Sequence, residues 1–300
     1  MNFSFFSQGC RLTATLLIFI ILAIAFSLWY QSAPAFHQFG WGFLTSRAWD
    51  PVNEDFGALS ALLGTLVTSL IAMLIVIPWS LLVALTVHLL VPVSFQKSVR
   101  VFIDLMAGIP SIIFGMWGMI VLVPIMANYV EPAMTATIGH LPLIGFLFSG
   151  PGIGIGIFTA GIILAMMVLP MLSAMLLDLL ETVPKQTEEA AFGLGAKPFE
   201  VMFKVLMPQI RSGFIGTCML GLGRALGETM AVTFVIGNSH QLFTSLFAPG
   251  TTISSSIANE FTEALGKLYP SSLLALGFIL FAITFVVIVC ARLLLQRYKA

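Results

Sequence analysis

Two adjoining stretches decide the fold of this chain. Residues 181–212 read ETVPKQTEEAAFGLGAKPFEVMFKVLMPQIRS, and residues 213–236 continue as GFIGTCMLGLGRALGETMAVTFVI. The first stretch gathers charge between two very apolar runs, and the second is apolar except for Arg224 and Glu228. A mostly apolar segment of about 18 or more residues is typical of a helix that crosses a membrane. We therefore predict a charged loop that leads directly into a membrane helix with charge inside it.

The composition of the whole chain supports this prediction. Hydrophobic residues make up 59% of the 300 residues and charged residues only 9%, whereas soluble domains carry about 25% charged residues. The apolar residues form long runs, which favours helices over the short alternating strands of membrane barrels. We predict an all-α integral membrane protein with one transmembrane domain over 1–300. Its six spans are expected at about 12–30, 58–90, 110–130, 152–176, 213–236 and 272–294.

The first two spans need separate comment. Ala33-Pro34-Ala35 resembles a signal-peptide cleavage site, but the apolar core before it exceeds the roughly 7–15 residues of a signal peptide, so we expect an uncleaved anchor. The second run is longer than the about 20 residues that one crossing needs. We expect Pro78 to kink or end the crossing and the remainder to continue along the cytoplasmic surface.

Lysine and arginine are distributed unequally between the two sides of the predicted membrane. One side carries only Arg47 and Lys267, whereas the other carries ten basic residues: Arg11, Lys97, Arg100, Lys185, Lys197, Lys204, Arg211, Arg292, Arg297 and Lys299. Basic residues favour the cytoplasmic side, so both termini and the loop 177–212 are expected there. The outer loop 237–270 is then either a solvated connector or a docking surface for a soluble partner.

The fifth span carries the candidate substrate path. Thr217, Gly221, Arg224 and Glu228 follow one another at intervals of four, three and four, which predicts a shared helical face. An ionisable residue at mid-membrane costs about 2.5–3.5 kcal/mol, so such residues usually face protein or a water-filled path. The guanidinium of Arg224 suits the oxygens of a tetrahedral anion. We expect Glu228 to neutralise Arg224 when the path is empty; the alternative is a salt bridge that only holds helices together.

Other patterns argue against catalysis by this chain. It has no G-x4-G-K-[ST] loop, and its four histidines show no metal-ligand spacing. We therefore expect no enzyme active site, no cofactor, no metal and no nucleic-acid partner. Gly150, Gly152, Gly154 and Gly156 are interpreted as small residues that permit close packing of membrane helices, rather than as a nucleotide-binding loop.

Three segments resemble a known family. Glu189-Ala190-Ala191, then Gly195, then Val205-x-Met207-Pro208 reproduces the spacing EAA-x3-G-x9-I-x-L-P of permease subunits in ABC importers, with valine and methionine as conservative departures. The segment 222–232, LGRALGETMAV, is similar to that of PstC-type permease subunits of bacterial phosphate-specific importers. The segment 107–115, AGIPSIIFG, also resembles phosphate permeases.

The resemblance implies specific partners and roles. It implies an inner-membrane subunit that moves phosphate together with a PstA-type second permease subunit, two ATP-binding subunits that hydrolyse ATP, and a periplasmic phosphate-binding protein. Glu189, Ala190, Ala191, Gly195 and Pro208 would belong to a coupling loop of two short helices with a turn at 193–198, docked on an ATP-binding subunit. Two alternatives remain: a permease for sulfate or molybdate, and a secondary transporter or channel that works without ATP.

Overall fold

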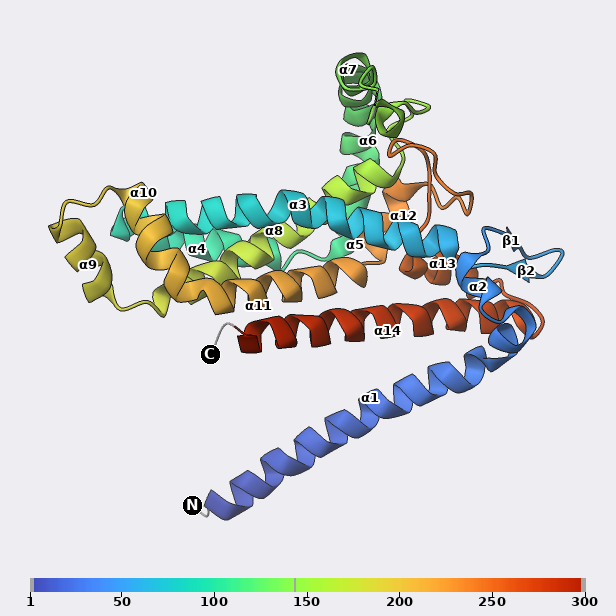
Figure 1. The fold of residues 1–300 in the computed structure, drawn as a ribbon, viewed down its shortest axis with the longest axis horizontal. Coiled ribbons are helices and arrows are strands. Elements are labelled where there is room, and N and C mark those ends of the chain that lie inside the picture. Colours follow the sequence, from blue (N-terminus) through green and yellow to red (C-terminus); the bar gives the residue numbers. More distant parts are fainter. Residues whose placement is uncertain (1–2, 143, 298–300) are drawn as a thin grey trace.

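The computed structural model describes residues 3–142 and 144–297. Figure 1 shows long helices that run roughly side by side along one direction, with helix α9 (Lys185–Gly193) at one end of the molecule and a small β-hairpin at the other. We refer to these as the α9 end and the hairpin end. The long helices are α1 (Phe3–Phe39), α3 (Leu59–Leu89), α8 (Ile157–Glu181), α11 (Met207–Leu226) and α14 (Leu268–Arg297).

The number of membrane-spanning segments agrees with the sequence prediction. Within residues 3–142 and 144–297, five helical segments are long and apolar enough to cross a membrane, and a sixth crossing arises if one bent helix pair is counted as a single span. That pair joins Pro198–Leu226 to α12 (Met230–Ile236) with a bend of 58°. The continuous helix expected over 213–236 is therefore wrong, because the helix ends at Leu226 and begins again at Met230.

Helix α3 corrects the prediction for Pro78. The helix is continuous over 31 residues and passes through Pro78 without ending, so residues 79–89 do not form a separate surface segment. Proline is tolerated inside membrane helices because neighbouring helices and local adjustments satisfy the freed backbone groups. The next helix, α4 (Val93–Ala107), packs beside α8.

The third span differs in direction from the other helices. It consists of α5 (Ser111–Trp117), α6 (Val123–Ile125) and α7 (Glu131–Thr137), joined by π-helical turns at Gly118–Leu122 and Met126–Val130. Figure 1 shows α6 and α7 projecting away from the other helices. Residues 108–110 separate α4 from α5, where Pro110 has an extended backbone and cannot donate a hydrogen bond.

The glycine-rich segment before α8 is a loop, which corrects two predictions. Gly152 and Gly154 have φ angles of +65° and +75°, a backbone conformation that favours glycine. A Cβ at Gly154 would overlap the carbonyl oxygen of Val123. Gly154 therefore allows the loop backbone to approach helix α6, Gly152 serves the turn through its positive φ, and α8 begins at Ile157 rather than at 152.

Three apolar clusters hold the helices together. The central cluster joins α3 and α8 to α5, α11 and α12, a second lies toward the α9 end, and a third lies toward the hairpin end. Helix α1 contacts α14 through Trp29 and Phe36, both beside Phe278, and then diverges from it, as Figure 1 shows. The remaining short elements are α2 (Gly42–Thr45), β1 (Trp49–Asp50), β2 (Asp55–Phe56), a 3-10 turn (Gly145–Phe148), α10 (Pro198–Glu200), a π-helical turn (Val201–Leu206) and α13 (Ile253–Glu260).

Candidate functional site: a broken membrane helix and a coupling segment

The break between α11 and α12 is the central feature of the candidate path. Gly227 ends α11, and its N–H donates to the carbonyl of Gly223 at 3.3 Å. Glu228 Oε1 accepts a hydrogen bond from the N–H of Ala231 at 3.3 Å, which satisfies a free donor in the first turn of α12. Glu228 thus has a definite role at the start of α12, in the middle of an otherwise apolar crossing.

Arg224 lies in the last turn of α11 and is exposed. Within the described part of the chain it makes no ion pair, and Glu228, which is half-buried, does not contact it as a salt-bridge partner. In this conformation the guanidinium group of Arg224 is therefore available to a ligand or to another subunit. A salt bridge between these two residues does not hold the helices together here.

Thr217 and Gly221 lie close to Arg224 in angle around the helix, as expected, but they differ from it in burial. Both are buried, and a Cβ at Gly221 would overlap Leu172 Cδ1 of α8. The residues are close in angle around the helix, but the edge of the buried surface of α11 runs between Gly221 and Arg224. We therefore assign Thr217 and Gly221 to helix packing within this chain.

The uncovered face of α11 holds residues that the sequence analysis missed. Leu220 is 57% exposed, Gly227 is exposed, and a Cβ at Gly216 or Gly223 would meet no atom within 4 Å. These four positions follow one another at intervals of four, three and four. The same spacing was found in the sequence from Thr217 to Glu228. Together with Arg224 they form what we call the open face of α11.

The predicted coupling loop, which we call the coupling segment, contains the first of the two expected short helices. The second is not a separate short helix, because α10 continues through the π-helical turn into α11 as one helix from Pro198 to Leu226. Helix α9 ends at Gly193 and α10 begins at Pro198, and Gly195 between them has a φ of +84°. Glu189 and Ala190 are exposed on α9, whereas Ala191 is half-buried against the core cluster near the α9 end. Pro208 directly follows the π-helical turn Val201–Leu206 inside this continuous helix, so it makes no break before the membrane helix.

The coupling segment also carries exposed apolar side chains that were not singled out from the sequence. Leu194 is 90% exposed, Phe199 69% and Phe192 41%. A cluster of apolar side chains on the surface of an otherwise charged segment is typical of a protein–protein contact. The sequence could have indicated this surface, because three large apolar residues lie in the most charged part of the chain.

A cluster at the hairpin end joins four parts of the chain: β1, the loop 237–252, α13 and α14. Glu260 accepts hydrogen bonds from Trp49 Nε1 at 2.7 Å, from Tyr269 Oη at 2.7 Å and from His240 Nε2 at 2.5 Å, and Trp49 stacks on His240. Burial alone would raise the pKa of Glu260, but the hydrogen bonds from His240, Tyr269 and Trp49 outweigh it and hold the pKa below the ordinary glutamate value. The cluster fixes the loop 237–252 to α13 and α14.

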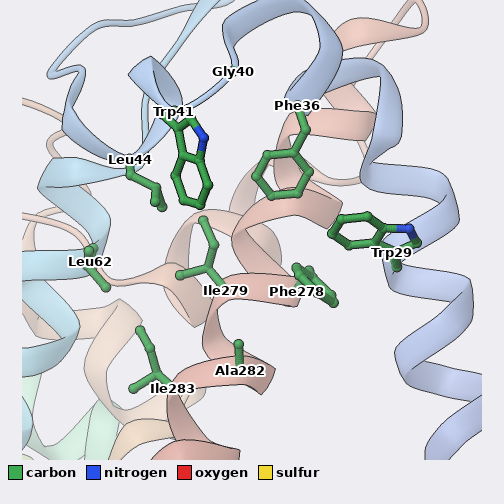
Figure 2. Close-up of a pocket in the computed structure, with 10 residues that line it drawn as sticks. All are labelled: Trp29, Phe36, Gly40, Trp41, Leu44, Leu62, Phe278, Ile279, Ala282 and Ile283. Carbon is green, nitrogen blue, oxygen red and sulfur yellow. The ribbon is translucent and has the colours of Figure 1, made fainter.

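An apolar groove near the hairpin end is not a candidate anion site. Figure 2 shows Trp41 pointing into a space between α1, α3 and α14, and the volume of this space is about 520 Å³. Its lining contains no charged side chain and consists of Trp29, Phe36, Gly40, Trp41, Leu44, Leu62, Phe278, Ile279, Ala282 and Ile283. An anion in this groove would find neither a cation nor a set of convergent donors. The described residues also include no group of three or more His, Cys, Asp or Glu side chains able to hold a metal ion.

Comparisons with known proteins agree with this architecture. Residues 77–300 match the family model described as "Binding-protein-dependent transport system inner membrane component". The chain is 47% identical over 295 residues to the phosphate transport system permease protein PstC of Mesorhizobium japonicum, covering 98% of this chain and 90% of the relative. It is 35% identical to the probable phosphate transport system permease protein PstC of Methanocaldococcus jannaschii, covering 96% and 92%.

Solved structures share the fold at low sequence identity. A chain of a bacterial alginate ABC transporter, in complex with an alginate-bound periplasmic protein, superposes with a TM-score of 0.62 at 18% identity, covering 99% of this chain and 97% of that chain. A chain of the MetNI methionine ABC transporter gives 0.56 at 16% identity, covering 81% and 94%. With the family model and the near-complete relatives, the resemblance inferred from the EAA spacing and from residues 222–232 is confirmed: this chain belongs to the binding-protein-dependent transport system inner membrane components, within the group of PstC-type permease subunits of ABC importers.

Proposed function

We propose that this chain is the membrane subunit through which an ATP-driven importer moves inorganic phosphate. The observation that carries the proposal is the identity of 44–47% over nearly the whole chain to relatives named phosphate transport system permease protein PstC. Such identity extends through α11, α12 and the coupling segment, which are the elements that a transport cycle would use. The chemistry of Arg224 supports the same substrate class.

We place the substrate path along the open face of α11. Arg224 lies on this face beside Gly216, Gly223 and Gly227, which leave room next to the helix axis. A charged side chain at membrane depth needs a partner, a water-filled cavity or another protein surface. A path between this chain and a PstA-type second permease subunit meets that need, because the second subunit would close the open face from the other side.

The break at 227–229 lets α12 change its direction relative to α11. In the present conformation Glu228 holds the first turn of α12 instead of pairing with Arg224. The two residues are four positions apart, so a straighter helix would bring them onto one face. We propose that Glu228 exchanges between these two partners, neutralising Arg224 in the empty state and leaving it free when phosphate arrives.

The coupling segment supports dependence on ATP-binding subunits. Its exposed Glu189 and Ala190 and its exposed Leu194 and Phe199 present a mixed polar and apolar surface at the α9 end. We propose that two ATP-binding subunits contact the membrane pair and that one of them docks on this surface. The excess of lysine and arginine on this side of the chain supports a cytoplasmic location for the α9 end and for both termini.

The hairpin end then faces the periplasm, where a phosphate-binding protein would dock. Apart from the ends of α1, α3 and α14, this end comprises β1, β2, α13 and the loop 237–252, which the Glu260 cluster holds in place. A fixed outer surface suits a soluble partner that must align its ligand with the path. This arrangement would make the chain the link between cargo delivery on one side and ATP hydrolysis on the other.

The substrate is tested by uptake of labelled phosphate into cells that carry this chain as their only subunit of its kind. We expect uptake that depends on the chain and that is unaffected by an excess of sulfate or molybdate. Uptake that sulfate or molybdate suppresses would assign the permease to another oxyanion. Uptake that persists when the ATP-binding subunits are inactivated would instead indicate a secondary transporter or a channel.

A further inference from the structure

Two side chains that are 100 residues apart in the sequence join the coupling segment to a membrane helix. His88 lies in the last turn of α3, and its Nε2 is 2.7 Å from Glu188 Oε1 on α9. The side chains are only 18% and 15% exposed, so water competes little for this hydrogen bond. Because the ionised carboxylate is an acceptor only, the ring Nε2–H must be the donor, and the bond forms with neutral or charged histidine.

Helix α9 has two kinds of attachment: it packs against the π-helical turn Val201–Leu206 and follows buried Val183 after α8, and Glu188 bonds to α3. No residue of α9 is buried, and Glu189, Ala190 and Phe192 face outward. Ala191 is only half-buried at the edge of the core cluster. Among the described residues, the bond between Glu188 and His88 is the side-chain hydrogen bond that joins α9 directly to a long membrane helix.

The α3 side of the joint is firmly held. Gln96 of α4 donates to the carbonyls of His88 at 3.2 Å and Val91 at 2.9 Å, at the end of α3. Arg100, also on α4, bridges to Asp178 and Glu181 of α8. The end of α3 is thus fixed to α4, which is fixed to α8, and a displacement at His88 would move this group of helices together.

The other end of α3 reaches the hairpin end of the molecule. Thr65 Oγ1 accepts a hydrogen bond from the N–H of Ile253, the first residue of α13, at 2.9 Å. Gly64 lies so close to Thr251 that a Cβ would overlap the carbonyl oxygen of Thr251. A single continuous helix therefore contacts the coupling segment through His88 and the segment that carries Glu260 through Thr65.

We propose that the His88–Glu188 pair is the joint by which motion of the coupling segment is transmitted through α3 to the loop and helix at the opposite end. His88 is a positioning residue in this proposal and does not contact the substrate. The inference rests on the proposed function, since it assigns the route by which movement driven by ATP hydrolysis is transmitted to the opposite side of the membrane. Glu189, the neighbour of Glu188, faces outward and is left to contact the ATP-binding subunit.

The test compares phosphate accumulated per ATP hydrolysed in proteoliposomes that contain the full importer. We expect His88→Ala and Glu188→Gln to preserve assembly and ATP hydrolysis but to lower this ratio by about fivefold or more. The exchanged variant, His88→Glu with Glu188→His, should restore most of the ratio because it rebuilds the same hydrogen bond. Glu200→Gln is the matched control, since Glu200 pairs with Lys204 one turn later on its own helix and not with α3 or another long helix.

A second measurement does not depend on the cargo. Cysteines introduced at 88 and 188, in a background without Cys10, Cys218 and Cys290, should cross-link both in nucleotide-free and in ATP-bound complexes, since the joint stays closed as it moves. Unchanged coupling in His88→Ala, or cross-linking lost in one nucleotide state, would overturn the proposal. Failure of the proposed function would look different, because the unaltered complex would then accumulate no phosphate while the cross-link still formed.

Discussion

Gly221 of α11 lies directly against Leu172 of α8, so closely that a Cβ at position 221 would overlap the Leu172 side chain. Leu172 is fully buried in the central core and has no room to move aside. This contact explains why a glycine stands in the most informative part of the sequence. It also separates the packing side of α11 from its open face.

The contact predicts opposite effects for two glycines on the same helix. Gly221→Ala should lower the free energy of unfolding of the detergent-solubilised chain by about 1–3 kcal/mol, because the added methyl group overpacks the core. Gly216→Ala should leave stability unchanged or raise it by up to about 1 kcal/mol, since a Cβ there meets no atom and alanine favours the helix. Thermal unfolding of both variants measures the difference. Equal effects would contradict the assignment of the two faces.

The exposed apolar residues of the coupling segment make a separate prediction. Leu194→Ala should weaken binding of the ATP-binding subunits by about 1–2 kcal/mol, roughly tenfold, because an interface buries a leucine that is 90% exposed in the isolated chain. Titration of the ATP-binding subunit onto the permease pair in lipid nanodiscs gives the dissociation constant. Val52→Ala is the control, since Val52 is equally exposed at the hairpin end. A loss of affinity in both variants would show a general defect instead of a docking surface.

Glu131 provides a test of how a buried polar side chain in the third span contributes to stability. It is 1% exposed, its Oε2 accepts a hydrogen bond from the N–H of Gly154 at 3.1 Å, and its Oε1 has no partner among the described residues. Glu131→Gln keeps an acceptor for Gly154 and should retain stability. Glu131→Ala leaves that donor without a partner and should cost about 1–3 kcal/mol. Chemical unfolding of both variants distinguishes them, and a glutamine variant as unstable as the alanine variant would be inconsistent with this account.

The Glu260 cluster predicts a dependence of stability on pH. Because the folded state holds the pKa of Glu260 below the ordinary value of 4.5, the stabilisation is complete above that pH and is lost as the pH falls through the lower, folded pKa. Glu260→Gln should therefore cost about 1–3 kcal/mol at pH 7. The difference from the unaltered chain should shrink at pH values below 4.5. A difference in the free energy of unfolding that does not change as the pH is lowered would contradict the role of the ionised carboxylate.

Local sequence patterns predicted much of this architecture. Apolar runs located the membrane segments, and the spacing from Glu189 to Pro208 predicted a short helix followed by a turn at Gly195, although the helix after this turn continues into α11. These features depend on neighbouring residues, which is why they can be read from the chain. The break at 227–229 was missed because its residues fit a helical pattern, and a membrane helix is interrupted only where the surrounding protein satisfies the free backbone groups.

Features that depend on contacts between distant segments could not be predicted. Nothing near His88 points to Glu188, and Trp49, His240 and Tyr269 meet at Glu260 only because four parts of the chain converge. The same reason explains why the burial of Thr217 and Gly221 was not predicted, since the spacing gave their angle around the helix but not where α8 would cover it. The helix does not end at Pro78, one of the two alternatives expected from the sequence, because neighbouring helices along α3 can satisfy the backbone group that the proline leaves free.

The most direct test of the central claim is ATP-driven accumulation of labelled phosphate in proteoliposomes that contain the full importer with Arg224→Gln. We expect accumulation to fall by about ten- to a hundredfold, since hydrogen bonds to a charged partner contribute about 1.5–3 kcal/mol. Arg292→Gln, which alters an exposed arginine on α14, should leave accumulation within about twofold. Normal accumulation with Arg224→Gln in an assembled complex would contradict the placement of the phosphate path along α11.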